Sequence, residues 1–445
     1  MNVKLYNQFL KVILILFGIV ILGPTFFGVL GLLFPAFGYF PSLGSNDFSI
    51  KYFYDLFLIP GILKSILLSF STGFFSTILA LLFSQIILLC IFNTRVYYYL
   101  KIIISPLLAM PHITMAVGLI FLLSPSGLIF RLLSPWLTGF HRPPDFFIIP
   151  DEYGLSLILG LTLKEIPFFL LASMAAIEQF PANNIFKIGK SLQHSNFSTW
   201  WLLIFPNLYK RIRLVIFIVI AFTSSVIDMA VLLAPSTPST LSIRILQIYQ
   251  SVDLDSIFIA SSLALLQVFV ILILILFWFL LEKIINQKFF FLFLIKTLPR
   301  KKSFIEKCLF TIGVFLILLS IVGIVNALFW GLGDQWYFPN IFPDNYTFDH
   351  LVTFLHENKS IMFISLFIAL IVSLISIITI VVWLELCDYL SFQNRYLESL
   401  IFIPLFIPQI SFLIGVQTFL IKIGFQSYLI ALIAIEILYV IPYCF

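Results

Sequence analysis

Four ionisable side chains lie inside stretches of sequence that are otherwise apolar: Lys164, Glu165, Asp228 and Glu436. A charge inside a membrane is costly, so such residues usually pair with another group or help to move an ion or a solute. Lys164 and Glu165 are adjacent, so they point about 100° apart on a helix and do not pair face to face. We expect Lys164 to pair with another helix. For Asp228 a gate or outer-vestibule role is as open as a structural one, and the role of Glu436 is open.

A second group of residues repeats in the two parts of the chain. In each case a proline precedes a hydrogen-bonding side chain, and a glycine follows the proline by seven residues. Proline leaves backbone carbonyls free, and inside a membrane only a polar cavity or a neighbouring group can satisfy them. We predict that these residues line a translocation pathway, with the alternative that His112 and Gln409 only join neighbouring helices by hydrogen bonds. The six residues are Pro111, His112, Gly118, Pro408, Gln409 and Gly415.

Other kinds of chemistry find no support in the sequence. No GxxxxGK[ST] motif occurs, so the chain has no P-loop for ATP. The four cysteines form no CxxC pair, and no cluster of His, Cys, Asp and Glu has the spacing of metal ligands. The sequence therefore predicts a transport protein that is not an enzyme and holds no cofactor or metal. Its energy has to come from ATP bound by a partner subunit or from an ion gradient.

Long apolar segments must position these residues. The chain has 445 residues, of which 61% are hydrophobic and 10% charged. Runs of close to twenty apolar residues are long enough to cross about 30 Å of hydrocarbon. The sequence therefore predicts an all-α polytopic membrane protein embedded in the lipid bilayer. About ten transmembrane helices are expected, at 8–33, 61–92, 102–123, 154–176, 213–234, 257–284, 307–330, 361–385, 398–421 and 427–445.

The distribution of basic residues sets the expected orientation. With the N-terminus on the cytoplasmic side, seventeen of the twenty-five Lys and Arg residues fall in cytoplasmic segments. This asymmetry is the positive-inside pattern, so the N-terminus is predicted to be cytoplasmic. It also accounts for the net charge of +5, and nucleic acid is not expected as a partner.

The two parts of the chain match as weak internal repeats of a transporter. Pro111 and Gly118 are offset by 297 residues from Pro408 and Gly415, and an Ile-Pro-aromatic sequence recurs in a later span of each part. Three regions are expected. They are a first half at 1–284 with a cytoplasmic loop at 177–212, a basic linker at 285–306 and a second half at 307–445. The second half lacks counterparts of roughly 171–284, so we expect it to be truncated before a second loop.

The cytoplasmic loop contains the stretch "PANNIFKIGKSLQHSNFSTWWLLIFP". Ile185, Ile188 and Leu192 recur at intervals of three and four, which places them on one face of a short helix. Ser195 is suited to cap a second short helix, and we expect Pro206 to end that helix. The sequence thus predicts a helix-turn-helix between the fourth and fifth spans.

This loop resembles the EAA loop of ABC importer permeases, whose short helix docks on the cytoplasmic ATPase subunit. Lys187, Ile188 and Gly189 stand where that family has Glu-Ala-Ala, Gln193 stands for a glycine, and Pro206 closes the counterpart of Leu-Pro. A solvated loop that only anchors to the membrane is the alternative. The resemblance implies a set of coupling residues, namely Lys187, Gly189, Leu192, Gln193, Ser195, Phe197 and Pro206.

Longer stretches, such as "SPLLAMPHITMAVGLIFLLSPSG" and "DEYGLSLILGLTLKEIPFFLL", resemble the fused permeases of YnjC-like ABC importers, relatives of the thiamine and ferric-iron permeases. The resemblance implies a type I permease fold in a bacterial inner membrane. It also implies a periplasmic solute-binding protein and two copies of an ATPase as partners. That family has about twelve spans and two EAA loops, whereas ten spans and one loop are expected here, and we therefore expect impaired transport.

The sequence leaves two transport mechanisms open. The favoured one is the permease subunit of a binding-protein-dependent ABC importer, which forms the solute pathway and couples to ATPase subunits. The alternative is a secondary transporter driven by an ion gradient, in which Lys164, Glu165 or Asp228 couples the ion. The residues do not identify the solute.

Overall fold

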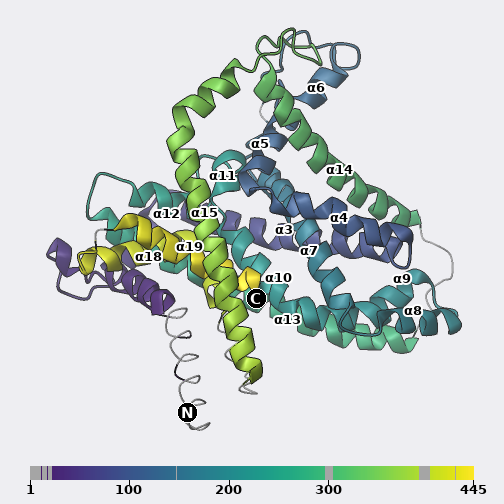
Figure 1. Cartoon of the computed structure of the whole chain (residues 1–445), viewed down its shortest axis with the longest axis horizontal. Helices are drawn as coiled ribbons and strands as arrows, with labels where there is room; N and C mark the ends of the chain where they lie inside the picture. Colours follow the sequence, from purple (N-terminus) through teal and green to yellow (C-terminus); the bar gives the residue numbers. More distant parts are fainter. Residues whose placement is uncertain are drawn as a thin grey trace. The chain divides into compact units, whose positions relative to one another are not determined.

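The protein is built from helices that follow one another along nearly the whole chain (Figure 1). The computed structural model describes Val12, Gly18 and residues 23–146, 148–295, 304–389, 401–425 and 427–445, with the side chains of 286–295 and 304–306 left out. Its elements are an apolar helix at Gly23–Ala36, η1 (Pro41–Leu43), α2 (Lys51–Leu58), α3 (Ile62–Ile91), α4 (Arg95–Ala109), α5 (His112–Leu123), α6 (Leu128–Leu133), α7 (Leu155–Ile177), α8 (Ala182–Ser191), α9 (Asn196–Thr199), η2 (Trp200–Ile204), α10 (Phe205–Ser225), α11 (Asp228–Leu233), α12 (Leu241–Tyr249), α13 (Ser256–Ile295), α14 (Phe304–Leu332), α15 (Asp349–Tyr389), α17 (Ile403–Phe406), α18 (Gln409–Lys422) and α19 (Tyr428–Cys444). No β-strand occurs among these described residues, only two isolated bridges.

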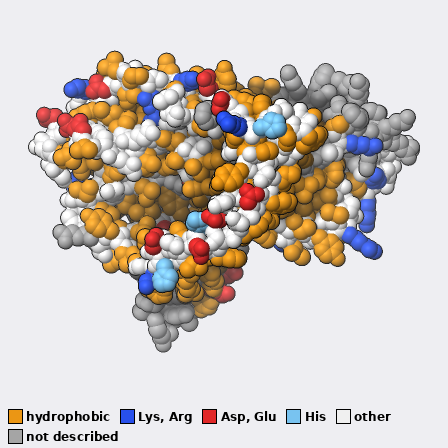
Figure 2. All heavy atoms as spheres, turned by 90° about the horizontal axis from the view of Figure 1, so that it is seen from above, with side chains coloured by type: hydrophobic (Ala, Val, Ile, Leu, Met, Phe, Trp, Pro, Cys, Tyr) orange, Lys and Arg blue, Asp and Glu red, His pale blue; other side chains and the backbone are white. Residues whose placement is uncertain are grey.

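The helices suit a membrane. Within the described ranges, six are long and apolar enough to cross a bilayer, and three shorter apolar helices accompany them. Figure 2 shows hydrophobic side chains over much of the visible face, as expected for surfaces that meet lipid. The prediction of an all-helical polytopic membrane protein is confirmed. The count of ten spans remains a prediction, because parts of the first span, the linker and the ninth span lie outside the described residues.

Three of the predicted spans are not single helices. The span at 102–123 breaks before Pro111, the one at 398–421 breaks before Pro408, and the one at 213–234 breaks at Val226. The two prolines cannot donate a backbone hydrogen bond and disfavour the helical conformation in the residue before them. Continuous helices were therefore the wrong expectation at these prolines, and both breaks create helix ends with free backbone groups.

The chain divides into two compact units. One contains Met1–Ile62, Arg244–Phe269 and Asp349–Phe445; the other contains Leu63–Ile243 and Val270–Phe348. Each unit draws residues from both of the predicted halves. The division into halves therefore describes the sequence repeat and remains a prediction, whereas the packing follows these discontinuous units.

In the larger unit, α3, α5, α7 and α10 form the core. Hydroxyl and amide groups are paired within it: Gln85 donates to the Ser173 hydroxyl over 2.9 Å, and the hydroxyls of Thr77 and Thr223 lie 3.3 Å apart. The buried Arg131 of α6 donates to backbone carbonyls of the segment after α14 and lies over the ring of Trp336. These contacts fix the helices that carry the candidate site.

Each of the two predicted pathway glycines allows a close helix contact. In the larger unit, a Cβ on Gly118 of α5 would lie 2.9 Å from the carbonyl carbon of Gly323 on α14. In the smaller unit, a Cβ on Gly415 of α18 would lie 1.9 Å from the carbonyl oxygen of Gly28. Both predicted pathway glycines therefore have a packing role, since the backbones touch where they lie.

Candidate functional site

The α4–α5 break lies beside two buried charged side chains of the larger unit, Lys164 and Glu165. Pro111 forms the N-cap of α5 with an extended backbone, and Met110 before it is also extended. The Lys164 ammonium, on α7, donates to the carbonyl oxygens of Leu107 over 3.0 Å, Leu108 over 2.9 Å and Met110. The predicted interhelical partner of Lys164 is thus backbone and not an acidic side chain.

Glu165 faces a different neighbour. Its Oε1 lies 3.7 Å from Nε2 of His112, the first residue of α5. At this distance the two form an ion pair only when the imidazole is protonated, and no normal hydrogen bond joins them. The His112 ring also lies 4.7 Å from the ring of Phe222 on α10, and its side chain is 28% exposed whereas that of Glu165 is 6% exposed. The structure therefore brings His112, Lys164 and Glu165 together at one helix break.

Neither of the other two intramembrane charges forms a hydrogen bond or ion pair with the described residues, but Asp228 interacts electrostatically with Lys164. Asp228 is the first residue of α11, directly after the break in the predicted fifth span, and is partly exposed. Glu436 is partly exposed on α19. Both positions suit a surface along a pathway as well as a structural surface, so the sequence-based alternatives for them stay predictions.

The second predicted pathway segment has the same backbone but different side chains. Pro408 is the N-cap of α18 and follows the extended Ile407. Gln409 is exposed, whereas Gly415 packs against the helix at Gly23–Ala36. That His112 and Gln409 face each other across one pathway remains a prediction, because each belongs to a different compact unit.

The predicted helix-turn-helix is formed by α8, α9 and η2. Gln193 joins the helices with φ +63°, a left-handed conformation that glycine adopts at least cost. This is the position at which the resembled family has glycine. Ser195 caps α9 by accepting a hydrogen bond from the Ser198 amide over 3.0 Å, as predicted. Gly189 lies directly against Thr199, since a Cβ there would be 2.5 Å from the threonine methyl. A small residue is required where the family has alanine.

The protein covers only part of the apolar stripe of α8, since Ile185 packs against the core and the other two residues of the stripe do not. Ala182, Phe186 and Gly189 are its buried residues, while Ile188 and Leu192 are 57% and 61% exposed. The spacing of the apolar residues predicted a helix face correctly, but tertiary packing against Phe92 and Thr199 selects another face for burial. The loop thus presents two large aliphatic side chains to its surroundings.

The sequence predicted that Pro206 would end the second short helix, and this prediction is wrong. Residues 200–204 form a π-helical stretch, and α10 continues from it with Pro206 in its first turn. Proline is tolerated in a first turn, where its missing N–H is not needed. Such π-helical stretches are rare in proteins, and those that occur often lie at functional sites. Four side-chain polar atoms of this region are buried without a hydrogen-bond partner, namely Asn196 Oδ1, Thr199 Oγ1, Trp200 Nε1 and Trp201 Nε1.

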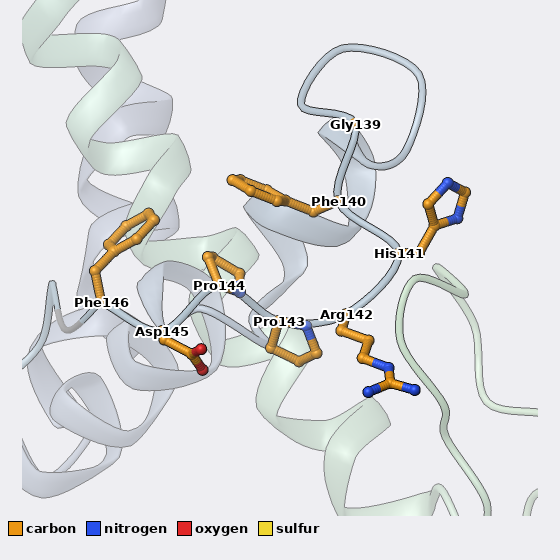
Figure 3. A pocket seen from close by; sticks show the side chains of 8 residues that line it. All are labelled: Gly139, Phe140, His141, Arg142, Pro143, Pro144, Asp145 and Phe146. Carbon is orange, nitrogen blue, oxygen red and sulfur yellow. The ribbon is translucent and has the colours of Figure 1, made fainter.

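One further hollow lies in the loop before α7. It has a volume of about 580 Å³ and is lined by eight consecutive residues, 139–146. Figure 3 shows that the side chains of His141, Arg142 and Asp145 point in different directions and do not converge on one point. No group of three or more potential metal ligands occurs in the part of the chain that the structure describes. The hollow contains none of the residues predicted from the sequence.

Comparison with known proteins gives one informative relative. No family model and no solved structure match the chain. The inner membrane ABC transporter permease protein YnjC of Escherichia coli (strain K12) is 24% identical over 214 residues. The match covers 48% of this chain and 40% of the relative, so the chain corresponds to less than half of that relative's length.

Proposed function

We propose that this chain is the permease subunit of a binding-protein-dependent ABC importer. It forms part of a solute pathway across a bacterial inner membrane, with a cytoplasmic N-terminus, and its loop at 182–204 couples that pathway to two copies of a cytoplasmic ATPase. A periplasmic solute-binding protein delivers the solute. The chain holds no cofactor of its own, because the partner subunits bind ATP.

The observation that carries this proposal is an exposed apolar surface on the well-ordered helix α8. The loop is held by the Ser195 cap and by the Gly189–Thr199 contact, yet Ile188 and Leu192 are exposed next to the basic side chains Lys187 and Lys190. Exposed aliphatic residues on an ordered loop are typical of a protein interface. The printed name of the relative, an ABC transporter permease, agrees with an ATPase as the occupant.

The α4–α5 break supports a pathway role for its neighbours. His112 is partly exposed at the start of a half-helix, beside the nearly buried Glu165. Half-helix ends near the middle of a membrane are where transporters commonly place their substrate groups. We propose His112 and Glu165 as pathway residues in the first half. Gln409 is their counterpart in the second half, and Gly118 and Gly415 allow the close helix packing around them.

The ion-coupled alternative has less support from the geometry. An ion-coupling residue must release and rebind its ion or proton as the transporter cycles. The ammonium of Lys164 has three N–H donors, and three backbone carbonyls accept from it. Lys164 is therefore suited to hold a helix break together, and Glu165 or Asp228 would have to carry any coupling.

Copurification with an ABC ATPase tests the proposal. The full chain is expressed in its own host, extracted with mild detergent and analysed for ATPases that carry a GxxxxGK[ST] motif. We expect Ile188→Asp and Leu192→Asp to reduce the recovered ATPase by about tenfold or more, because a charge enters the apolar contact. Asn184→Asp is the matched control, since Asn184 is exposed on the same helix. Recovery that is equal for all three variants would contradict the proposed docking surface.

A further inference from the structure

The C-terminal end of α4 has more carbonyl groups than its own helix can satisfy. In a continuous helix the Leu107 carbonyl would accept from the amide of residue 111, but Pro111 has no N–H. The helix ends at Ala109 and its C-cap Met110 is extended, so the Leu108 carbonyl also loses its normal donor at His112. At membrane depth no water replaces these donors.

The carbonyls of Leu107, Leu108 and Met110 all accept hydrogen bonds from one atom, Nζ of Lys164. Lys164 is 3% exposed, and α7 brings it to this end from more than fifty residues away in sequence. The partial negative charge at a helix C-terminus adds to the attraction for a cation. Carbonyl oxygens that converge on one point, with a negative dipole behind them, form the kind of site that holds a potassium ion in place of its hydration shell.

We propose that the α4–α5 break is a monovalent-cation site whose resident cation is the tethered ammonium of Lys164. Ammonium and potassium ions are close in size, and the carbonyl oxygens of Leu107 and Leu108, at 3.0 and 2.9 Å from Nζ, lie at a distance that suits either ion, while the Met110 carbonyl completes the site. A sodium ion is smaller and fits this spacing poorly. The site is therefore specific for a primary ammonium or a potassium-sized ion.

Lys164 interacts with its acidic neighbours Glu165 and Asp228 only through charge. Because all three of its donors point to α4, Lys164 makes no hydrogen bond to Glu165, which is left to His112 at 3.7 Å. Lys164 thus acts as a positioning residue: it fixes the end of α4 and with it the first turn of α5. This inference concerns the fold at the break and does not rest on the proposed coupling to an ATPase.

Replacement of the tether by a free cation tests the site. The full chain is purified in lipid nanodiscs, and its thermal unfolding is measured in equal ionic strengths of potassium, sodium, ethylammonium and tetramethylammonium chloride. Lys164→Ala leaves the carbonyls and makes room for an ion. We expect its midpoint to fall by about 5 °C or more and to recover by at least half in potassium or ethylammonium. Sodium and tetramethylammonium should restore little.

Two controls separate this result from a general salt effect. Lys164→Met keeps a side chain of similar length in the space without a charge, so it should be destabilised and should not respond to any of the four salts. Lys101→Ala removes an exposed lysine from α4, the helix whose carbonyls form the site, and this variant should unfold like the parent chain. The proposal is overturned if Lys164→Met is as stable as the parent, or if Lys164→Ala recovers equally in all four salts or in none.

A double variant keeps the test decisive if Lys164→Ala and Lys164→Met do not accumulate. Pro111→Ala restores a backbone N–H at residue 111, which can donate a hydrogen bond to the Leu107 carbonyl. The loss caused by Lys164→Met should therefore be at least halved in the Pro111→Ala background, measured as folded protein recovered from membranes. An equal loss in both backgrounds would mean that Lys164 does not serve the carbonyls that the proline leaves free.

Discussion

The α4–α5 break and the α17–α18 break have nearly the same backbone. Met110 has φ −70° and ψ 139° and Pro111 has φ −59° and ψ 146°, compared with −86° and 127° for Ile407 and −52° and 131° for Pro408. In both, a glycine seven residues after the proline packs against the backbone of another apolar helix. The two breaks therefore share a proline, a glycine and one backbone geometry.

The side chains around the two breaks differ in charge. The first has Lys164 on three carbonyls and Glu165 beside His112. In the sequence repeat the residue that corresponds to Lys164 is Tyr439, whose hydroxyl is buried without a hydrogen-bond partner and whose ring packs edge-on against Phe412. The same backbone thus carries an ionic cluster in one unit and a neutral, apolar one in the other. The first break therefore relies on a charged side chain where the second has Tyr439 at the corresponding position.

Removal of the two corresponding side-chain groups should give the largest contrast. Lys164→Met leaves three carbonyls unpaired at membrane depth, and we expect it to lower the free energy of unfolding by about 3 kcal/mol or more. Tyr439→Phe removes a hydroxyl that has no partner, so its effect should lie within about 0.5 kcal/mol of zero. Thermal and denaturant unfolding of the purified chain measure both. Equal losses would show that the breaks depend on these side chains to the same degree.

The glycine contacts should differ by less. Gly415→Ala places a methyl group 1.9 Å from the position of the Gly28 carbonyl oxygen, so backbone has to move, at a cost of about 3 kcal/mol. In Gly118→Ala the new methyl group would lie 2.9 Å from the carbonyl carbon of Gly323. This substitution should lower the free energy of unfolding by about 1–2 kcal/mol. Gly331→Ala is the control, since no atom lies within 4 Å of its Cβ position, and it should leave unfolding unchanged. The reverse order for the first two would contradict the packing described for α18 and α5.

The N-terminal ends of α7 and α19, which follow the two breaks in the chain, differ in their capping. We expect this difference to have the smallest effect on stability. The Asp151 carboxylate accepts hydrogen bonds from the amides of Leu155 and Ser156 at the start of α7, whereas the N-cap of α19, Ser427, makes no side-chain cap bond. We expect Asp151→Asn to cost about 1 kcal/mol at neutral pH and Ser427→Ala close to nothing. Unfolding midpoints of the two variants and the parent provide the measurement.

The Asp151 effect should depend on pH. Partial burial raises the pKa of its carboxyl, but the hydrogen bonds from Ser156, Leu155 and Tyr153 together outweigh burial and bring the pKa below its ordinary value of 3.8. A pKa lowered by folding gives stability that is complete above the unfolded value and is lost as the pH falls through the folded one. The difference between the parent and Asp151→Asn should therefore persist at pH 5 and shrink below about pH 4. A difference that stays constant down to pH 2 would exclude this role.

The sequence predicted those features that depend on local chemistry. The apolar runs gave the helices, Pro111 and Pro408 marked the special positions, and Ser195 was recognised as a cap. The resemblance to a known loop placed Gln193 where the family has a glycine, and the structure has a positive φ at that residue. Each of these follows from residue type and short-range spacing, which act in the same way wherever the segment lies.

Features that depend on distant contacts were not predictable. The carbonyl partners of Lys164 lie more than fifty residues away, and no pattern in α7 points to them. The exposure of Ile188 and Leu192 depends on which face of α8 meets Phe92 and Thr199. The missing donor at Pro111 was the one available signal, because a proline inside an apolar span requires some group to satisfy the freed carbonyl.

The most direct test of the central claim is photo-crosslinking from the loop in native membranes. A photoreactive phenylalanine analogue replaces Ile188 on α8 in one variant and Tyr153, which is 73% exposed before α7, in another. Our account predicts that position 188 forms an adduct with a protein that carries the GxxxxGK[ST] motif and that position 153 does not, because the proposed topology places the two on opposite sides of the membrane. An equal yield of ATPase adduct from both positions, or none from position 188, would contradict the proposal that this chain is an ABC permease.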